Sequence, residues 1–241
     1  MAENRAKSGH DDVVLLKDVS KSFELGRSTI GALQGVSLRA RAGQMTALVG
    51  PSGSGKTTIL NLVGALDRPS SGGVTVAGQE LNALGSDQLA DFRNRTVGFV
   101  FQNFNLIPVL TTLENVLLPS QIGRSNEPEQ VLVERACHLL DRVGLAAQMN
   151  QPVNRLSGGQ MQRVSVARAL MNQPKVILAD EPTANLDHAT SEKVLELLKN
   201  LCVEERAAVL VATHDPAVLP YCRSIIRMKD GIIVATEDTH G

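Results

Sequence analysis

The chain has 241 residues, of which 43% are hydrophobic, 20% are charged and 2% are aromatic, and its formal net charge is −1. This length and composition predict a globular protein with a sizeable core, in one large domain or two small ones. The near-neutral charge argues against a surface that binds nucleic acid, and no stretch approaches the ~20 apolar residues that span a bilayer, so we expect neither a nucleic-acid partner nor direct membrane insertion.

The cysteines and the N-terminus both bear on the cellular compartment in which the chain works. Cys137, Cys202 and Cys222 lie far apart and form no C-x-x-C pair, which predicts free thiols in a reducing compartment. Residues 1–11 mix charged residues, Gly and Ser without a period, so we expect a disordered tail and no signal peptide. The folded domain is predicted over residues 12–241.

The first predicted strand covers residues 13–20, where apolar residues alternate, and a second extended segment covers residues 32–41. Phe23 lies between them. Because aromatic residues are rare in this chain, Phe23 is a candidate for stacking on a nucleobase. The alternative is a phenylalanine in the core of a small antiparallel sheet.

A phosphate-binding pattern follows the predicted strand at residues 46–49. Residues 50–57 fit G-x-x-x-x-G-K-[ST], and residues 58–63 continue as an amphipathic helix. Glycines here let consecutive N–H groups turn inward around a phosphate at the positive end of a helix. Lys56 adds a charge, and the Thr57 hydroxyl is a candidate Mg²⁺ ligand. The predicted phosphate-binding residues are Gly50, Pro51, Ser52, Gly53, Ser54, Gly55, Lys56, Thr57 and Thr58.

A turn at residues 70–73, a strand at 74–76 and a helix at 87–95 come next, before a buried strand at 97–101. Gln102 ends that strand. A glutamine at the carboxyl end of a strand beside a phosphate site can ligate Mg²⁺ or orient water.

A helix is predicted over residues 127–143, and the absence of strand patterns between 120 and 144 indicates an inserted helical subdomain. Residues 156–160 read Leu-Ser-Gly-Gly-Gln just before a helix predicted at 161–171, with Ser157 suited to its cap. This is a second anion-binding helix start. Two such helix ends far apart in one chain suggest a symmetric dimer, in which each chain's second site closes over its neighbour's first.

Residues 176–180 form a continuous apolar strand that ends in Asp180, a Walker-B pattern in which the carboxylate holds Mg²⁺ through water. Glu181 follows and can act as the general base for attacking water; the alternative is a solvated strand end. After a helix at 189–201 and a strand at 208–212, His214 occupies a position where it can contact a γ-phosphate. A hairpin is predicted at 224–228 and 232–235, and His10, His138, His188 and His240 are expected to be solvated.

Taken together, these motifs resemble the ATP-binding subunit of an ABC transporter, in that family's order and over nearly the whole chain. The resemblance implies an α/β P-loop NTPase fold with an ABC-type nucleotide-binding domain over 12–241, a small antiparallel β subdomain, and a helical subdomain at about 103–172. It implies a head-to-tail dimer around two ATP and Mg²⁺. The catalytic residues it implies are Lys56, Gln102, Glu181 and His214; the metal ligands are Thr57, Gln102 and Asp180; Phe23 stacks on the base; and Ser157, Gly158, Gly159 and Gln160 bind the neighbour's nucleotide.

Two segments, residues 100–108 and 113–116, look like the MacB/LolD group, which serves lipoprotein release and macrolide or peptide export. Residues 181–187 also resemble that group, with Ala184 where Gly is commoner; Met161 and Ser165 are further departures. The resemblance implies a separately encoded integral membrane permease and a peripheral location on the cytoplasmic face of the inner or plasma membrane.

Two other functions fit the same motifs. A soluble ABC ATPase of a cytoplasmic assembly scaffold would work without a membrane partner, and a regulatory switch would bind the nucleotide without hydrolysing it. The transported substrate and the direction of transport are not encoded in a chain that contacts the partner and not the cargo.

Overall fold

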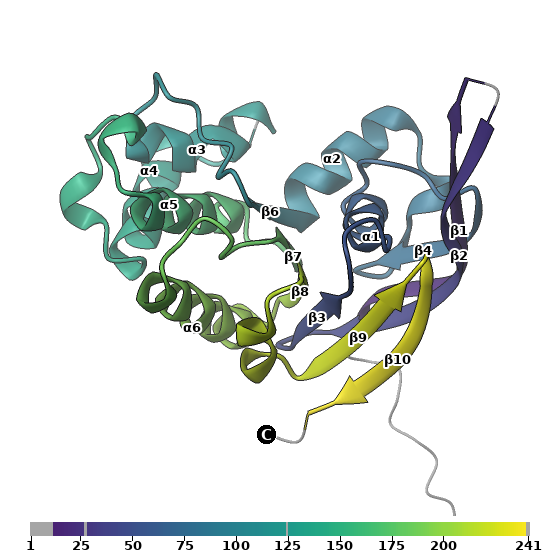
Figure 1. Cartoon of the computed structure of the whole chain (residues 1–241). Helices are drawn as coiled ribbons and strands as arrows, with labels where there is room; N and C mark the ends of the chain where they lie inside the picture. The colour runs from purple at the N-terminus through teal and green to yellow at the C-terminus, as the bar shows by residue number, and fades with distance from the viewer. Residues whose placement is uncertain (1–11, 27, 124, 240–241) are drawn as a thin grey trace, which may run out of the picture.

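A six-stranded sheet runs through the centre of the molecule (Figure 1). The computed structural model describes residues 12–26, 28–123 and 125–239, so the predictions for residues 1–11 and 240 lie outside it. The strand order is β10 (Ile232–Asp238), β9 (Ser224–Lys229), β3 (Met45–Val49), β8 (Ala208–Thr213), β7 (Val176–Asp180) and β6 (Val97–Phe101). All neighbours pair in parallel except β9 and β10, which form the predicted antiparallel hairpin.

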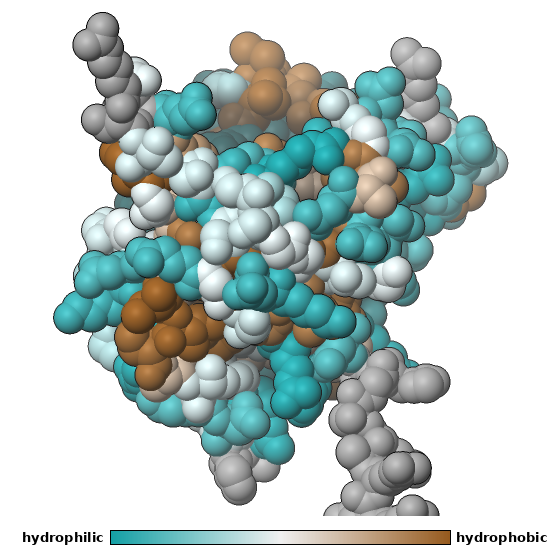
Figure 2. Space-filling view, turned by 90° about the vertical axis from the view of Figure 1, so that its right-hand side faces the viewer, coloured by the Kyte–Doolittle hydropathy of each residue, from teal (hydrophilic) through white to brown (hydrophobic). Residues whose placement is uncertain are grey.

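A smaller antiparallel sheet lies beside it, in the order β2 (Ser28–Arg41), β1 (Asp12–Leu25), β4 (Ser71–Val76) and β5 (Gln79–Glu80). The predicted strand at 13–20 is therefore too short, because β1 continues to Leu25 and carries Phe23 within it. Figure 2 views the side that these strands form together with β9 and β10; hydrophilic residues dominate it, and hydrophobic ones gather in separate patches.

The helices are α1 (Lys56–Val63), α2 (Ser86–Thr96), α3 (Thr112–Ile122), α4 (Glu129–Arg142), α5 (Gly158–Leu170) and α6 (His188–Glu204). Short 3₁₀ turns lie at Leu81–Ala83, Ala146–Gln148, Val153–Arg155 and Pro216–Tyr221. Helix α4 begins two residues later than predicted because Pro128 precedes its first turn. Helix α6 runs three residues beyond the predicted end because Cys202 continues its buried face.

The central strands separate two cores, one on each face of the sheet. Along β3, Ala47 packs with the core built from α3 to α6, whereas Leu48 packs with the core built from α1, α2 and the antiparallel sheet. Strands β7 and β8 alternate in the same way, for example Ile177 against Leu178. A parallel sheet covered on both faces needs apolar residues at every position, which explains the continuous apolar runs in the sequence.

Between β6 and β7 the described chain contains helices and no named strand. Helices α3, α4 and α5 group on one side of the molecule, away from β1, β2 and β4 (Figure 1). Within the described ranges, no helix has the length and hydropathy that crossing a bilayer requires.

Candidate functional site

Four segments that are distant in sequence meet at one edge of the central sheet. They line a pocket of about 480 Å³, and the loop between β3 and α1 together with the first turn of α1 contributes most of its lining residues. Because the carboxyl ends of parallel strands lie at the same edge, β6 brings Gln102 there, β7 brings Asp180 and Glu181, and β8 brings His214. The structure therefore brings together the residues at these strand ends that were predicted to act at a bound phosphate.

The loop before α1 depends on two glycines for its shape. Gly55 has φ +100°, and a Cβ there would lie 2.6 Å from Leu33 Cδ2. At Gly50 a Cβ would lie 2.2 Å from the carbonyl oxygen of Met228 in β9. The chain thus turns sharply against its neighbours, and α1 begins with no side-chain cap. Its first N–H groups remain available to an anion, with the helix dipole favouring negative charge.

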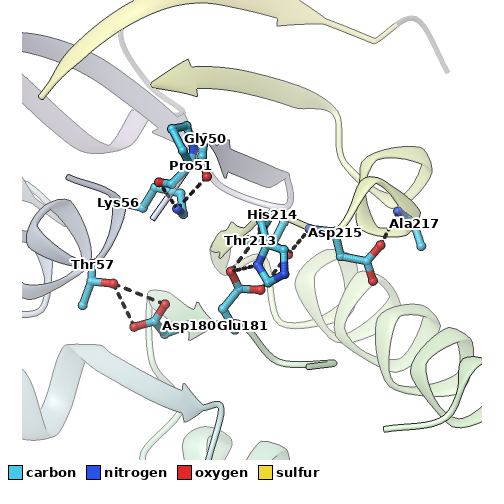
Figure 3. Close-up of polar contacts among 10 residues, drawn as sticks. All are labelled: Gly50, Pro51, Lys56, Thr57, Asp180, Glu181, Thr213, His214, Asp215 and Ala217. Atoms are coloured by element: carbon cyan, nitrogen blue, oxygen red, sulfur yellow. Dashed lines mark hydrogen bonds and ion pairs between the residues drawn. The ribbon is translucent and has the colours of Figure 1, made fainter. Parts of the chain in front are cut away.

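Lys56 is the first residue of α1, and its side chain folds back into this loop, so that the residue is only 8% exposed. Its ammonium donates to the carbonyl oxygens of Gly50 at 2.8 Å and Pro51 at 3.0 Å (Figure 3). The Ser54 hydroxyl is also buried and has no hydrogen-bond partner in the described chain. A buried cation, an unpartnered hydroxyl and a free helix start together fit a phosphate group.

Thr57 faces Asp180 across the pocket, with its hydroxyl 3.1 Å from Asp180 Oδ2 (Figure 3). Burial raises the pKa of the Asp180 carboxyl above its ordinary value, and the hydrogen bond from Thr57 acts against that rise. A hydroxyl and a carboxylate so close, with Gln102 in the same pocket, form the hard oxygen donor set that Mg²⁺ prefers. The residues present therefore fit the predicted metal ion.

Glu181 is held by three donors from Thr213, the last residue of β8, and from His214, which follows it. Its Oε1 accepts the His214 backbone N–H at 3.1 Å and lies 2.6 Å from His214 Nδ1, and its Oε2 accepts the Thr213 hydroxyl at 3.0 Å (Figure 3). The Glu181 side chain is 15% exposed and that of His214 is 72% exposed. Glu181 also has φ +46°, a backbone conformation that a non-glycine residue adopts only when its surroundings hold it.

Sequence reasoning missed Thr213. Its hydroxyl accepts the backbone N–H of Asp215 at 3.0 Å while donating to Glu181, so it joins the turn after β8 to the carboxylate. The only available signal was a threonine at the end of a buried strand, next to His214, and such residues are frequent in β-structure for packing reasons alone.

The predicted nucleobase contact is not brought into the pocket. Phe23 lies on β1 with 39% of its surface exposed, and the Lys21 ammonium lies 4.9 Å from its ring centroid. The alternative interpretation, a phenylalanine in the core of the small sheet, is therefore wrong, because hairpin residues near the end of β1 project into solvent. Stacking on a base stays a prediction.

The second anion-binding segment lies apart from this pocket. Ser157 and Gly159 line a separate cavity of about 170 Å³ with residues of α6. Ser157 caps α5 as predicted, since its hydroxyl accepts the Gln160 N–H at 3.3 Å and Gln160 Oε1 accepts the Ser157 N–H at 2.8 Å. The helix nevertheless begins at Gly158, three residues before the predicted start, because this reciprocal cap draws both glycines into the first turn.

The two glycines of this segment differ in what surrounds them. A Cβ at Gly159 would lie 2.3 Å from Thr190 Cγ2, so packing against α6 requires glycine there. A Cβ at Gly158 would meet nothing closer than the Asn185 carbonyl at 3.7 Å, which is ordinary contact. Packing within the chain therefore does not explain the glycine at 158.

A groove of about 440 Å³ lies between α2, β6, α3 and α5. Leu66 and Ile122, which are 50% and 69% exposed, form part of its mostly apolar wall together with Phe101. Asn105 and Arg168 also line it, so the groove reaches the segment that follows Gln102.

The remaining chemically reactive residues lie elsewhere. Cys137, Cys202 and Cys222 are free thiols, and burial raises the pKa of Cys202 and Cys222 to about 12. His138 and His188 are exposed, as predicted. Among the described residues, there is no metal site built from three or more His, Cys, Asp and Glu side chains. The Mg²⁺ set above is of a different kind, because it includes a hydroxyl and an amide.

A parallel sheet with a glycine-rich loop, a Walker-B strand end and a separate capped Ser-Gly-Gly helix start defines an ATP-binding cassette. Comparison with known families agrees: the family model described as ABC transporter matches residues 33–184, more than half of the chain. The chain belongs to the ABC transporter family, and it is an ATPase of that type.

The individual relatives of the chain point to a narrower group within this family. It is 46% identical over 222 residues to the lipoprotein-releasing system ATP-binding protein LolD of Anaeromyxobacter dehalogenans, covering 92% of each chain. It is also 46% identical to the macrolide export ATP-binding/permease protein MacB of Syntrophobacter fumaroxidans, covering 92% of this chain but 31% of that protein. The chain therefore spans about a third of the MacB relatives it matches.

Among solved structures, it is similar to the ATP-binding cassette MJ0796 of Methanocaldococcus jannaschii in a dimeric post-hydrolysis state bound to ADP and Pi. The identity is 44%, the TM-score is 0.86, and the match covers 95% of this chain and 99% of that one. The predicted fold class is confirmed.

Proposed function

We propose that this chain is the ATP-hydrolysing subunit of a MacB/LolD-type transporter, and that two copies close around two Mg-ATP. We infer the dimer from the separation of the two anion-binding helix starts. Lys56 and Ser157 line different cavities of one chain, and Gly158 is a glycine that the chain's own packing does not need. A second copy that presents Ser157, Gly158, Gly159 and Gln160 to the nucleotide accounts for both features. The dimeric form of the similar archaeal cassette supports it.

Within each site, residues 50–58 bind the phosphates, and Lys56 neutralises their charge. Thr57, Asp180 and Gln102 hold Mg²⁺, which when bound neutralises charge that develops on the phosphate oxygens. Phe23 stacks on the base once the site is complete. The phosphate and Mg²⁺ assignments rest on the pocket that the loop, Gln102 and Asp180 line together, whereas the assignment of Phe23 rests on the family resemblance alone.

Glu181 acts as the general base in this proposal. As water attacks the γ-phosphorus, Glu181 accepts its proton, a new P–O bond forms, and the bond to the bridging oxygen of ADP breaks. Both Glu181 oxygens already accept hydrogen bonds from Thr213 and His214. Exposed His214 can leave Glu181 and donate to the γ-phosphate, which frees one carboxylate oxygen for the water.

The transport partner is a separately encoded integral membrane permease, and the chain binds it from the cytoplasmic face of the inner or plasma membrane. The apolar groove beside Gln102 is the docking surface we assign to it. A nucleic-acid partner and direct membrane insertion are not part of the proposal. The assembly-scaffold function is not favoured, since relatives over nearly the whole chain are named as lipoprotein-releasing and macrolide-export proteins.

The test uses Glu181→Gln, which keeps the shape but removes the base. We expect ATP hydrolysis to fall by about 10²- to 10⁴-fold and light scattering to show a dimer only with Mg-ATP. A Glu181→Gln variant that stays monomeric at saturating ATP contradicts the shared site. Detergent extraction of the tagged wild-type chain should recover a membrane protein; recovery of soluble partners alone contradicts the permease.

A further inference from the structure

The segment that follows Gln102 has an unusual backbone. Phe104 and Asn105 are consecutive non-glycine residues in the left-handed region, with φ +59° and +48°. A left-handed conformation is unfavourable for a residue with a Cβ, and more so for a bulky one such as Phe than for Asn. Two in succession persist only where neighbouring groups hold them.

One side chain supplies that support. The Arg168 guanidinium donates to the Phe104 carbonyl at 2.7 Å and to the Asn105 carbonyl at 2.5 Å. The planar fork of arginine suits two adjacent carbonyls. In the observed conformation both backbone acceptors point to the same group, so the two hydrogen bonds stabilise it.

The position of Arg168 costs free energy, because burial removes water from its guanidinium. Burial lowers the pKa of its guanidinium below the ordinary value, although arginine stays charged at physiological pH. Arg168 appears in no ion pair among the described residues. A partly desolvated cation that donates to backbone carbonyls and not to a carboxylate is poorly explained by stability alone.

The segment it holds joins the two sites described above. Gln102 lines the nucleotide pocket, whereas Asn105 and Arg168 line the apolar groove. At the nucleotide end, the Gln102 carbonyl accepts from Asn185 Nδ2 at 3.0 Å. Residues 102–105 are therefore fastened at one end by the segment before α6 and at the other by α5.

We propose that Arg168 is a positioning residue for ATP hydrolysis: its two hydrogen bonds hold Phe104 and Asn105 in the left-handed conformation that places Gln102 in the nucleotide pocket. The inference rests on the proposed function of Gln102 and assigns a control element to it.

The experiment is a double-mutant cycle on the full chain, with kcat and the Mg²⁺ concentration for half-maximal activity as readouts. The variants are Arg168→Met, Gln102→Ala, their combination and Arg168→Lys, which retains donors for a carbonyl. Arg142→Met is the matched control, since Arg142 joins α4 to Glu204 and Glu205 at the C-terminal end of α6, away from the pocket. Thermal unfolding of each variant measures its structural cost.

If Arg168 acts through Gln102, Arg168→Met lowers kcat by about 10- to 100-fold, the scale of a misplaced catalytic group, and raises the Mg²⁺ requirement. The combined variant is no slower than Gln102→Ala, Arg168→Lys recovers part of the activity, and Arg142→Met keeps the wild-type kcat. Losses that multiply in the combined variant overturn the proposal, because independent sites add in free energy.

Two further outcomes separate this inference from the proposed function beneath it. If Gln102→Ala is impaired and a folded Arg168→Met variant has wild-type kcat and Mg²⁺ dependence, the positioning role is wrong and Gln102 keeps its own. If Gln102→Ala hydrolyses ATP like the wild type, the proposed function of Gln102 is wrong, and the role of Arg168 falls with it.

Discussion

Replacing Thr213 by valine tests how Glu181 is held. The two side chains have nearly the same shape, and Thr213 is fully buried at the end of β8, so the change removes a hydroxyl without opening a cavity. Two hydrogen bonds disappear: the one to Glu181 Oε2 and the one from the Asp215 N–H, both 3.0 Å long.

The first loss acts on catalysis. A hydrogen bond to a charged group contributes about 1.5–3 kcal/mol, and the lower figure applies here because Glu181 keeps the backbone N–H of His214 as a donor. Since 1.36 kcal/mol corresponds to tenfold in rate, we expect kcat to fall about tenfold. The second loss acts on stability: an unpaired backbone N–H costs about 1–3 kcal/mol, and each kcal/mol lowers the Tm by about 2–4 °C in a chain of this size.

Steady-state phosphate release and thermal unfolding measure the two effects. Thr213→Ser keeps the hydroxyl and should retain kcat close to the wild type. Thr46→Val is the matched control, because Thr46 is also buried, on neighbouring β3, and should not change kcat. Wild-type turnover in Thr213→Val, or equal damage in Thr213→Ser, would refute the reasoning.

Three other changes test separate features. Gly158→Ala should leave the Tm unchanged, because its Cβ has room, yet abolish the ATP-dependent dimer of the Glu181→Gln variant in light scattering; a retained dimer contradicts the shared site. Gly159→Ala should lower the unfolding free energy by about 1–3 kcal/mol through overpacking, and Thr190→Ser, which removes the methyl 2.3 Å away, should restore it in urea titrations. Because burial raises the pKa of Cys202 and Cys222 to about 12, neither thiol should react with iodoacetamide at pH 8 until the chain unfolds, as mass spectrometry can show.

The sequence predicted the elements whose signals are local. Residues 97–101 and 176–180 read as buried strands because each is a short run of apolar residues, and both boundaries agree with β6 and β7. Parallel pairing then accounts for the meeting of Gln102, Asp180 and His214 at one edge. Chain order and strand polarity were enough to place them.

Features that depend on tertiary contacts were not predictable. Asn105 is of a residue type enriched in left-handed backbone, but nothing near it signals that Phe104 is left-handed too, because the stabilising group, Arg168, comes 63 residues after Asn105. The start of α5 was placed too late since Gly158 and Gly159 have low helix propensity, which the reciprocal Ser157 cap overrides. The predicted strand ended at residue 20, so neither the position of Phe23 on β1 nor its exposure to solvent was predicted.

Lys56 and Glu181, two charged groups that line the pocket, both have hydrogen-bond partners within the chain. The Lys56 ammonium bonds to carbonyls of its own loop, and Glu181 bonds to Thr213 and His214. A nucleotide entering this pocket therefore exchanges existing hydrogen bonds for new ones, and each exchange yields a net gain of only about 0.5–1.5 kcal/mol. In the dimer proposed above, Ser157 and Gly158 of the second copy therefore have to supply much of the net attraction for ATP.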